Sequence, residues 1–574
     1  MIRISLLAHL TLLLALVHAV VSHQHPFSAA QDATTTPRTQ SDVPQPPLFP
    51  SRETADVRRI AIVGGGPSGT SAAYFLSTAA SHLSSLNHTT TLSMTLFERS
   101  PILGGRAAIT HPYTNTSYDP IELGASIFAD VNYNLRRAVQ DFKLDTGAHT
   151  GVGGETGIWD GQQFLFTGDQ GSWWTSARFF LRYGYGAVTT QGLVARQLGW
   201  FSGLYRAPFL HSREREGEKE RKETVSGYPW STVGELAEAV NASSLVGQTG
   251  MAFLKDHRVG ELFIEEMVEA ATRVNYAQDT DAIHAFGAMV SLAASGATGV
   301  KTGNFRIFEE FAKRSGARIL TGVEGEVTGL IRYPTANGTK WYVGSKSGEG
   351  ELFDAVILAT PWHNSGITLL NTPHRVKGVP FVHLHVTLLT TSRTSPRGSY
   401  FGMGENDAVP RTILTSSESV RRAKGDTSKK GPRLEFFSLT YLRSVTHPQD
   451  GGKEWVVKIF SPSAIPVSLL DSLFGDSISW VQRHEWDSYP QLHPTDRFPH
   501  IEIDDNLYYS NALESLVSTM ETSTVAAKNS VALLMKKWFG DAFVNGKGCR
   551  YGVGDWGRDP MDGENWAGWG CDSG

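Results

Sequence analysis

Cysteine is nearly absent from this 574-residue chain, which contains only Cys549 and Cys571. Both lie in a C-terminal stretch rich in glycine and tryptophan, residues 541–574. Two thiols make no cysteine-based metal site, and no other cysteine exists to support thiol chemistry elsewhere. In an oxidising compartment the pair can close one loop, so we expect a Cys549–Cys571 disulfide in this tail.

An excess of charge of either sign is also lacking. Charged residues make up 19% of the chain, and the formal net charge is −5. This balance gives no reason to expect nucleic acid or an anionic membrane surface as a partner. The hydrophobic content of 40% is that of a globular protein with a substantial core.

Long apolar runs are limited to one, Leu6–Val17, which follows Arg3 and precedes the small residues Ala19 and Ser22. That order is typical of a cleaved secretory signal over residues 1–22, and the run is too short to span a bilayer comfortably. The alternative is a buried N-terminal helix. No other run predicts a membrane helix, and the polar C-terminus lacks the hydrophobic tail of a lipid-anchor signal.

A secretory signal predicts passage through compartments that oxidise thiols and attach glycans. Residues 23–56, rich in Pro, Thr, Gln and Ser, are expected to form a disordered leader after the signal. Four Asn-x-Ser/Thr sequons are then plausible glycan sites on exposed loops, at Asn87, Asn115, Asn241 and Asn337.

The most informative stretch is a short apolar strand that runs into three glycines and then a helix. Ile60–Val63 predicts the strand and Ala72–Leu76 the helix. Gly64 allows the tight turn, Gly66 lets the backbone approach a pyrophosphate, and Gly69 lets helix and strand pack closely. The anion would lie on the free N–H groups at the helix N-terminus. Such glycine turns also occur for structural reasons alone, so the strand–turn–helix context carries the interpretation.

A second strand and a further glycine pair favour a flavin over a nicotinamide cofactor. Leu92–Phe97 predicts a strand that ends at Glu98, whose carboxylate can accept hydrogen bonds from a ribose diol. Gly104, Gly105 and Arg106 follow a few residues later. This element resembles flavoproteins of the glutathione-reductase and amine-oxidase type, in which the glycines let the loop approach FAD and the arginine supplies charge to its phosphates. FAD is therefore the expected cofactor.

Further cofactor contacts are expected from segments far apart in the sequence. Tyr118–Ser126 predicts a strand that enters a turn, and comparable turns bring backbone near the isoalloxazine ring; the turn residues are Gly124, Ala125 and Ser126. Ala317–Leu330 predicts a strand pair whose Val327 feeds backbone to the adenine. Phe353–Pro361 predicts a third strand of the nucleotide-binding sheet. Glu514 lies in a turn before the closing helix, where the chain would contact the flavin phosphates.

These segments predict an α/β chain with a Rossmann-type FAD-binding domain of the glutathione-reductase or amine-oxidase type and a mixed α+β substrate domain. The FAD-binding domain is discontinuous and is expected to comprise residues 57–130, 300–365 and 500–540. The substrate domain would take residues 131–299, where helical spacing dominates, and residues 366–499.

Histidine is the remaining source of catalytic or metal-binding side chains. His284, His363, His383 and His385 are candidate proton shuttles, although a single histidine in an apolar setting is more often a hydrogen-bonded core residue. His383 and His385 alternate along one expected strand and so share a face. No carboxylate or cysteine pattern completes a metal site around them, and no metal is expected.

Four stretches together resemble the prenylcysteine oxidase (prenylcysteine lyase) family. The resemblance covers about residues 58–540, and the chain departs from the family at Ser510–Ala512, where a glycine is expected, and in its tail. The stretches are Phe97–Arg99 with Gly104–Arg106, Arg273–Gln278, Val456–Ser461 and Leu507–Asn529.

The resemblance implies an FAD-dependent thioether oxidase that cleaves farnesyl- or geranylgeranyl-cysteine with O₂ to cysteine, a prenyl aldehyde and hydrogen peroxide. It implies a role in breakdown of prenylated proteins in a lysosome or vacuole; the extracellular space is the alternative destination. Because sulfur carries no proton, hydride loss from the allylic carbon needs no catalytic base, and the flavin carries the reaction. Arg273 and Asn275 are candidates to hold the cysteine carboxylate and amine, or else to form an interdomain contact. A lipid substrate also suggests contact with a membrane surface.

Two other classes remain open at this point. A flavin amine or polyamine oxidase would share the fold and the oxidant but act on C–N bonds. A secreted, non-catalytic FAD-fold protein would bind a lipid or a partner instead.

Overall fold

The structure is a computed structural model that describes residues 57–147, 155–169, 173–202, 204, 228–293, 296–336, 338–405, 407–416, 434–540 and 543. Several expectations fall outside these residues. They are the signal peptide, the leader, the Asn337 sequon, the Cys549–Cys571 disulfide and nearly all of the tail.

A six-stranded sheet forms one end of the molecule, in the order β20-β21-β13-β1-β2-β9. β21, β13, β1, β2 and β9 run parallel, and β20 pairs antiparallel with β21. Ile60–Val63 is buried throughout, as a parallel strand covered on both faces requires. The strands are β1 (Val57–Val63), β2 (Thr91–Glu98), β9 (Arg318–Thr321), β13 (Ala355–Leu358), β20 (Glu502–Asp504) and β21 (Leu507–Tyr509).

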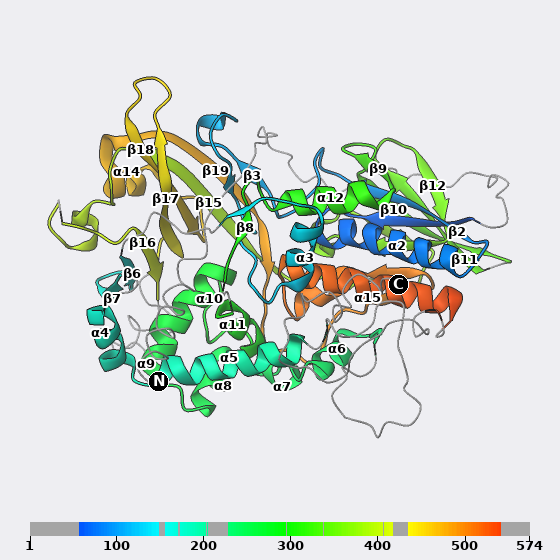
Figure 1. Cartoon of the computed structure of the whole chain (residues 1–574), viewed down its shortest axis with the longest axis horizontal. Coiled ribbons are helices and arrows are strands. Elements are labelled where there is room, and N and C mark those ends of the chain that lie inside the picture. Colours follow the sequence, from blue (N-terminus) through cyan, green and yellow to red (C-terminus); the bar gives the residue numbers. More distant parts are fainter. Residues whose placement is uncertain are drawn as a thin grey trace.

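Helix α2 (Pro67–Ser85) packs on this sheet, with α12 (Phe305–Ser315) and α15 (Met520–Phe539) beside it (Figure 1). Pro67 occupies the first turn of α2, where a missing N–H costs no hydrogen bond. α15 begins after Thr519, whose hydroxyl accepts a hydrogen bond from the Thr522 amide at 3.0 Å. The order β1–α2–β2 confirms the predicted strand, turn, helix and second strand.

A four-stranded sheet in the order β12-β11-β10-β14 lies next to the first. The expected strand pair in Ala317–Leu330 is wrong in one respect: the segment holds strands, but they do not pair. β9 pairs in parallel with β2, whereas β10 pairs with β11, because the turn between them carries the chain from one sheet into the other. The strands are β10 (Val327–Thr335), β11 (Gly338–Ser345), β12 (Gly350–Phe353) and β14 (Thr368–Leu370).

A seven-stranded sheet in the order β19-β15-β18-β17-β16-β6-β7 forms the other end. Helix α14 (Val467–Phe474) packs on one face, in a core with Leu389, Val457 and Ile459. The strands are β6 (Thr156–Trp159), β7 (Phe164–Gly168), β15 (Phe381–Thr391), β16 (Thr412–Thr415), β17 (Ser438–Thr446), β18 (Lys453–Ser461) and β19 (Ile478–Pro490).

Between the two sheets the chain is mainly helical, as the spacing of residues 132–299 predicts. The helices are α3 (Tyr133–Asp141), α4 (Trp173–Tyr183), α5 (Gly186–Ser202), α6 (Val233–Ala239), α7 (Ser243–Val246), α8 (Gly250–Asp256), α9 (Glu261–Phe263), α10 (Glu269–Tyr276) and α11 (Ala285–Ser291). Four two-residue strands accompany them, β3 (Ile109–Thr110), β4 (Ile121–Glu122), β5 (Thr146–Gly147) and β8 (Gly299–Val300).

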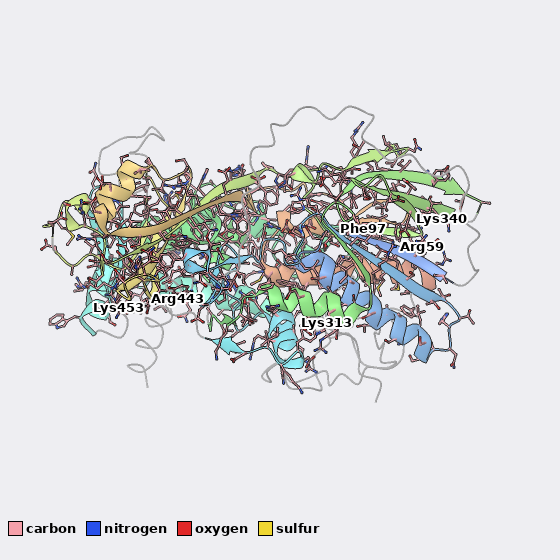
Figure 2. The ribbon with its side chains drawn as sticks, turned by 90° about the horizontal axis from the view of Figure 1, so that it is seen from above. Arg59, Phe97, Lys313, Lys340, Arg443 and Lys453 are labelled. Carbon is pink, nitrogen blue, oxygen red and sulfur yellow. The ribbon has the colours of Figure 1, made fainter. Side chains whose placement is uncertain are left out.

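The molecule is elongated, with the two large sheets at opposite ends (Figure 1). Figure 2 shows Arg59 and Phe97, from β1 and β2, at one end and Arg443 and Lys453, from β17 and β18, at the other. Helices α4 to α9 lie along one long edge. Of the helices in the described part of the chain, none combines the length and the apolar character needed to cross a membrane.

Candidate functional site

The end of β1 and the start of α2 are in direct contact. The Gly64 amide donates to the Phe97 carbonyl at 2.8 Å, and Gly64 has φ of +114°, a conformation that favours glycine. A Cβ at Gly69 would overlap the carbonyl oxygen of Gly64. The absent side chain at Gly69 therefore sets how closely the helix approaches the strand.

Gly66 has a different environment, because protein atoms leave space beside it. It precedes the first turn of α2 and has no side chain to cap the helix. A Cβ there would meet only Gly105, with the Gly105 Cα at 3.6 Å. The uncapped N–H groups of the helix start therefore lie next to an opening that suits an anion. This is where the sequence places the pyrophosphate.

Glu98 closes the same loop from the end of β2. Its Oε2 accepts from the Gly65 amide at 2.6 Å and its Oε1 from the Ser100 amide at 2.7 Å. Burial raises the pKa of Glu98, although both hydrogen bonds act in the opposite direction. Each carboxylate oxygen keeps a further lone pair, so the predicted ribose contact is compatible with this geometry.

The segment that contains Val327 lies beside Glu98. The Gly322 amide donates to the Ser100 carbonyl at 3.2 Å, and a Cβ at Gly325 would overlap the Glu98 carbonyl. Val327 is buried at the start of β10, and its amide donates to the Gly325 carbonyl at 3.1 Å. The structure thus brings this segment to the end of the sheet at which the adenine contact is predicted.

Arg106 and Glu514, both predicted to contact the cofactor, contact each other. Arg106 Nη2 forms an ion pair with Glu514 Oε1, and Nη1 donates to the Ser488 carbonyl at 2.9 Å. The guanidinium also lies over the Phe381 ring, 5.5 Å from its centroid. This pairing offsets the charge that the sequence analysis assigned to the phosphates. Arg106 here links β19 to η8 (Ser510–Ser515).

Buried polar atoms without a hydrogen bond mark the gap between α2 and η8. Ser68 Oγ, in the first turn of α2, and Asn511 Oδ1, in η8, have no partner. Both side chains line one narrow gap together with Glu514 and Thr522. Because buried polar groups are normally hydrogen-bonded, a polar ligand here would supply the missing partners. The Ser68 hydroxyl, a donor in the first turn of α2, fits a dinucleotide diphosphate, whereas Asn511 Oδ1 would need a hydrogen-bond donor.

The turn Gly124–Ser126 lies between the two large sheets. The strand expected before it is short, since β4 comprises only Ile121–Glu122. A Cβ at Gly124 would come within 3.1 Å of the Trp486 indole and of the Arg106 carbonyl. The Ala125 carbonyl accepts from Asn304 Nδ2 at 2.8 Å. The buried Trp486 Nε1 has no hydrogen bond, so this turn too borders unsatisfied polar atoms.

Two buried ionisable residues beside this turn were not singled out by the sequence analysis. Lys458 of β18 donates through Nζ to the Glu122 carbonyl at 2.7 Å and to Ser126 Oγ at 3.4 Å. Burial lowers the pKa of Lys458 to about 7 and raises that of Glu122 well above its usual range. Glu122 Oε2 is buried and has no hydrogen bond. The available signal was a lysine within the apolar run Val456–Ser461.

Arg273 and Asn275 are occupied by protein groups. Arg273 Nη1 pairs with Asp279 Oδ1 at 2.5 Å, and its Nε donates to Thr415 Oγ1 at 3.0 Å. Asn275 Nδ2 donates to the carbonyls of Ala271 and Ser291 at 3.0 and 3.1 Å. These contacts join α10 to β16 and α11, which favours the structural role over a substrate contact.

His284 and His363 are also engaged. His284 is fully buried, and its Nδ1 accepts from the Gly287 amide at 3.0 Å as the cap of α11. Burial lowers its pKa to about 4, so it is neutral at working pH and a poor proton acceptor. His363, in η5 (Trp362–Asn364), lies 2.9 Å from Asp487 through Nε2 and stacks on Phe381. Neither geometry supports the predicted proton shuttle.

The reasoning that left His383 and His385 without a carboxylate is wrong. β19 places Glu485 opposite His385 and Asp487 opposite His383. One ligand atom each from His383, His385 and Glu485 lie within 4.8 Å of one another. A separation of about 100 residues between the two strands hides this pattern from the sequence.

The two glycines of the α2 turn make a matched test. Gly66→Ala should fold, at a cost of about 1 kcal/mol at the helix start, but should lose most of its cofactor because the new methyl group occupies the opening. Gly69→Ala should fail to fold, because its Cβ overlaps the Gly64 carbonyl. Thermal unfolding measures the stability of each variant, and cofactor absorbance per chain measures its cofactor content. Gly234→Ala, whose Cβ would make only an ordinary contact with Thr232 Oγ1 at 3.8 Å, is the control. A Gly66→Ala protein with full cofactor content would contradict the assignment.

The chain is similar in sequence to known proteins along most of its length. The human protein named prenylcysteine oxidase 1 is 29% identical over 509 residues, which cover 84% of this chain and 90% of that protein. Farnesylcysteine lyase of Arabidopsis thaliana is 27% identical over 496 residues, covering 83% and 88%. Bovine prenylcysteine oxidase 1-like is 26% identical over 511 residues, covering 86% and 94%.

A solved structure of a putrescine oxidase double mutant covers 84% of this chain and 99% of its own, with a TM-score of 0.49 and 12% identity. A likeness at this level says nothing about the reaction. Residues 62–142 match the NAD(P)-binding Rossmann-like domain, and residues 166–543 match the model of prenylcysteine lyase. Because the second match spans more than half of the sequence, the chain belongs to the prenylcysteine lyase family.

Proposed function

We propose that this protein is an FAD-dependent oxidase that cleaves the thioether of S-prenyl-L-cysteine with O₂. The observation that carries the proposal is the opening at the start of α2, formed by Gly66 and Gly105 and bordered by the unpartnered Ser68 hydroxyl. It occurs in a chain of the prenylcysteine lyase family whose relatives are named for prenylcysteine and farnesylcysteine. Farnesyl- and geranylgeranyl-cysteine are both candidate substrates.

The residues that would hold FAD come from several strand ends and turns. The N-terminus of α2, with Gly66 and Ser68, would receive the diphosphate, and Glu98 the adenosine ribose. The turn Gly124–Ser126 would border the isoalloxazine ring. Bound FAD supplies a two-electron acceptor for the allylic hydride and passes the electrons to O₂.

The remaining chemistry consumes water and releases a proton. After hydride loss, water adds to the carbon next to sulfur, and the hemithioacetal collapses to cysteine and a prenyl aldehyde. In sum, thioether, O₂ and water give thiol, aldehyde and hydrogen peroxide. The protein must exclude other water, and buried apolar side chains beside the turn do so; they include Ile121, Leu123, Leu384 and Val386.

Lys458 is the residue placed to handle the proton. Its Nζ contacts the Glu122 carbonyl and the Ser126 hydroxyl, at the turn that would border the ring. With a pKa of about 7, the amine is protonated below neutral pH and largely neutral above it. The neutral amine can take the proton released when water adds, which is general-base assistance.

Anaerobic reduction tests the function directly. Farnesylcysteine added to the purified protein without O₂ should bleach the visible absorbance of oxidised flavin and release cysteine and farnesal. Spermidine and putrescine should leave the absorbance unchanged. Bleaching by the amines alone would replace the proposal with an amine oxidase. A colourless protein, or one that no compound bleaches, would favour a binding protein without catalysis.

The pH dependence tests Lys458. In the native protein kcat should rise with pH through about 7, because the neutral amine assists the addition of water, which follows hydride loss. Lys458→Met should lower kcat about 100-fold and remove that rise. Lys528→Met is the matched control, since burial also lowers the pKa of Lys528 to about 7 but its Nζ lies over the Tyr228 ring. An unchanged pH profile in Lys458→Met would refute this role.

We also propose that the protein docks on a lipid surface through α4 and α5. Among the described residues, large apolar side chains are exposed chiefly on these two helices. The α4–α5 surface consists of Trp174, Phe180, Leu181, Tyr185, Val188 and Trp200. Leu181 is 84% and Tyr185 70% exposed. Large apolar side chains exposed this often along one segment are typical of an interaction site.

The composition of this surface favours a bilayer as its partner. Tryptophan and tyrosine have an apolar body and a polar tip, which suits the headgroup region. Residues 173–202 contain Arg178, Arg182 and Arg196 but no acidic residue, in a chain with a net charge of −5. Glu266 neutralises Arg182, so Arg178 and Arg196 are left to give this segment a local positive charge. Each arginine near an anionic surface contributes about 1 kcal/mol.

The two helices are firmly attached to the rest of the protein. Arg182 forms two hydrogen bonds with the buried Glu266, at 2.8 and 2.6 Å, and the Tyr183 hydroxyl donates to the same carboxylate at 2.7 Å. A Cβ at Gly186, at the start of α5, would contact Phe263 at 3.0 Å. A rigid apolar face keeps its shape without the bilayer, which lowers the entropic cost of docking.

Vesicle flotation tests the α4–α5 surface. The native protein should float with phosphatidylcholine–phosphatidylserine vesicles, and Leu181→Asp with Trp200→Asp should weaken binding at least tenfold, while activity in detergent-free solution on soluble prenylcysteine is retained. Val467→Asp is the control, because Val467 is 74% exposed but lies on α14. The proposal would be contradicted if the native protein did not float with these vesicles, or if the double variant bound them as well as the native protein does.

We further propose a secretory route, ending in a lysosome, a vacuole or the extracellular space. The support is the predicted signal peptide and the exposure of Asn87, Asn115 and Asn241 in the structure. A native protein without any N-glycan would contradict this route.

A further inference from the structure

A cluster of histidines and carboxylates lies at the edge of the seven-stranded sheet. His383 and His385 come from β15, and Glu485 and Asp487 from the edge strand β19. The register pairs His385 with Glu485 and His383 with Asp487. Because residues two apart share a face of a strand, the four side chains project from one face of the sheet.

This face is opposite to the one that carries Lys458. β15 pairs Leu388 with Lys458 and His385 with Ser461, without an irregularity in between. Leu388 and His385 are three residues apart and so point to opposite faces. The cluster is therefore separate from the turn at Gly124–Ser126 and has no part in the proposed reaction.

The two imidazoles converge on one carboxylate oxygen. Glu485 Oε2 lies 3.9 Å from His383 Nε2 and 3.3 Å from His385 Nδ1. The three ligand atoms lie within 4.8 Å of one another. Zinc–ligand distances of about 2.0–2.2 Å require the atoms to move closer by small side-chain rotations. Such rotations are available, because the side chains of His383 and Glu485 are 53% and 64% exposed.

A second layer of contacts orients the cluster. His383 Nδ1 lies 3.0 Å from Asp487 Oδ1, and the other oxygen, Oδ2, lies 2.9 Å from His363 Nε2. His363 is itself stacked on Phe381, with ring centroids 4.2 Å apart. A carboxylate that accepts from one ring nitrogen fixes the imidazole so that the other nitrogen can bind a metal. This leaves His383 Nε2 facing Glu485.

We propose that His383, His385 and Glu485 bind a divalent transition-metal ion of the zinc type, with Asp487 as the positioning residue for His383. Two imidazoles and one carboxylate suit Zn²⁺ rather than Ca²⁺ or Mg²⁺, which prefer oxygen ligands alone. Water would complete the coordination on the exposed side. The ion would join the edge strand β19 to β15 and, through Asp487 and His363, to the loop after β13.

Isothermal titration of the chelator-treated full-length protein with ZnCl₂ tests the site. We expect one Zn²⁺ per chain at this site and a rise in the unfolding temperature on adding zinc. His385→Ala and Glu485→Gln should each weaken binding at least tenfold, and Asp487→Asn should weaken it less. Calcium should not compete.

His447→Ala is the matched control, because His447 also pairs with a carboxylate, Asp450 at 2.8 Å, but among the described residues it belongs to no group of three metal-ligating side chains. It should bind zinc as the native protein does. Unfolding temperatures measured in chelator check that all variants fold. If His385→Ala does not fold, Glu485→Gln still tests the site, because it changes an exposed side chain. The proposal is overturned if the native protein takes up no zinc, or if the cluster variants and His447→Ala bind it equally.

Discussion

The close approach of α2 to β1 is the constraint on which the rest of the structure depends. Gly69 has no room for a side chain against the Gly64 carbonyl, so helix and strand meet at van der Waals distance. That contact brings the uncapped helix N-terminus to the carboxyl end of a parallel sheet, where an anion gains from the helix dipole and the free N–H groups. The same edge of the sheet also brings together Glu98, the Val327 segment and η8. Two buried polar atoms there, Ser68 Oγ and Asn511 Oδ1, have no hydrogen bond.

The seven-stranded sheet presents different chemistry on its two faces. One face carries Lys458 to the turn Gly124–Ser126, where burial lowers the pKa of the amine to about 7. The other face carries the histidine–carboxylate cluster at its edge. Both follow from the alternation of side chains along β15, β18 and β19. Arg106 joins the two ends of the molecule, since it pairs with Glu514 and also donates to the Ser488 carbonyl of β19.

Local patterns were predictable from the sequence, and long-range pairings were not. The glycines between β1 and α2 act within a few residues of one another, so their spacing predicts the turn correctly. Glu485 is about 100 residues from His385, and no sequence pattern shows that the strands pair. The same holds for Arg106 and Glu514, whose ion pair changes the role expected of the arginine. The exposure of Leu181 and Trp200 was equally hidden, because an aromatic-rich helix is more often part of a core.

The central claim is that the opening beside Gly66 receives the diphosphate of FAD. The most direct test is mass spectrometry of the small molecule released when the natively secreted protein is denatured. The account predicts FAD, close to one per chain. Release of a nicotinamide dinucleotide, or of no dinucleotide from a folded protein, would contradict it.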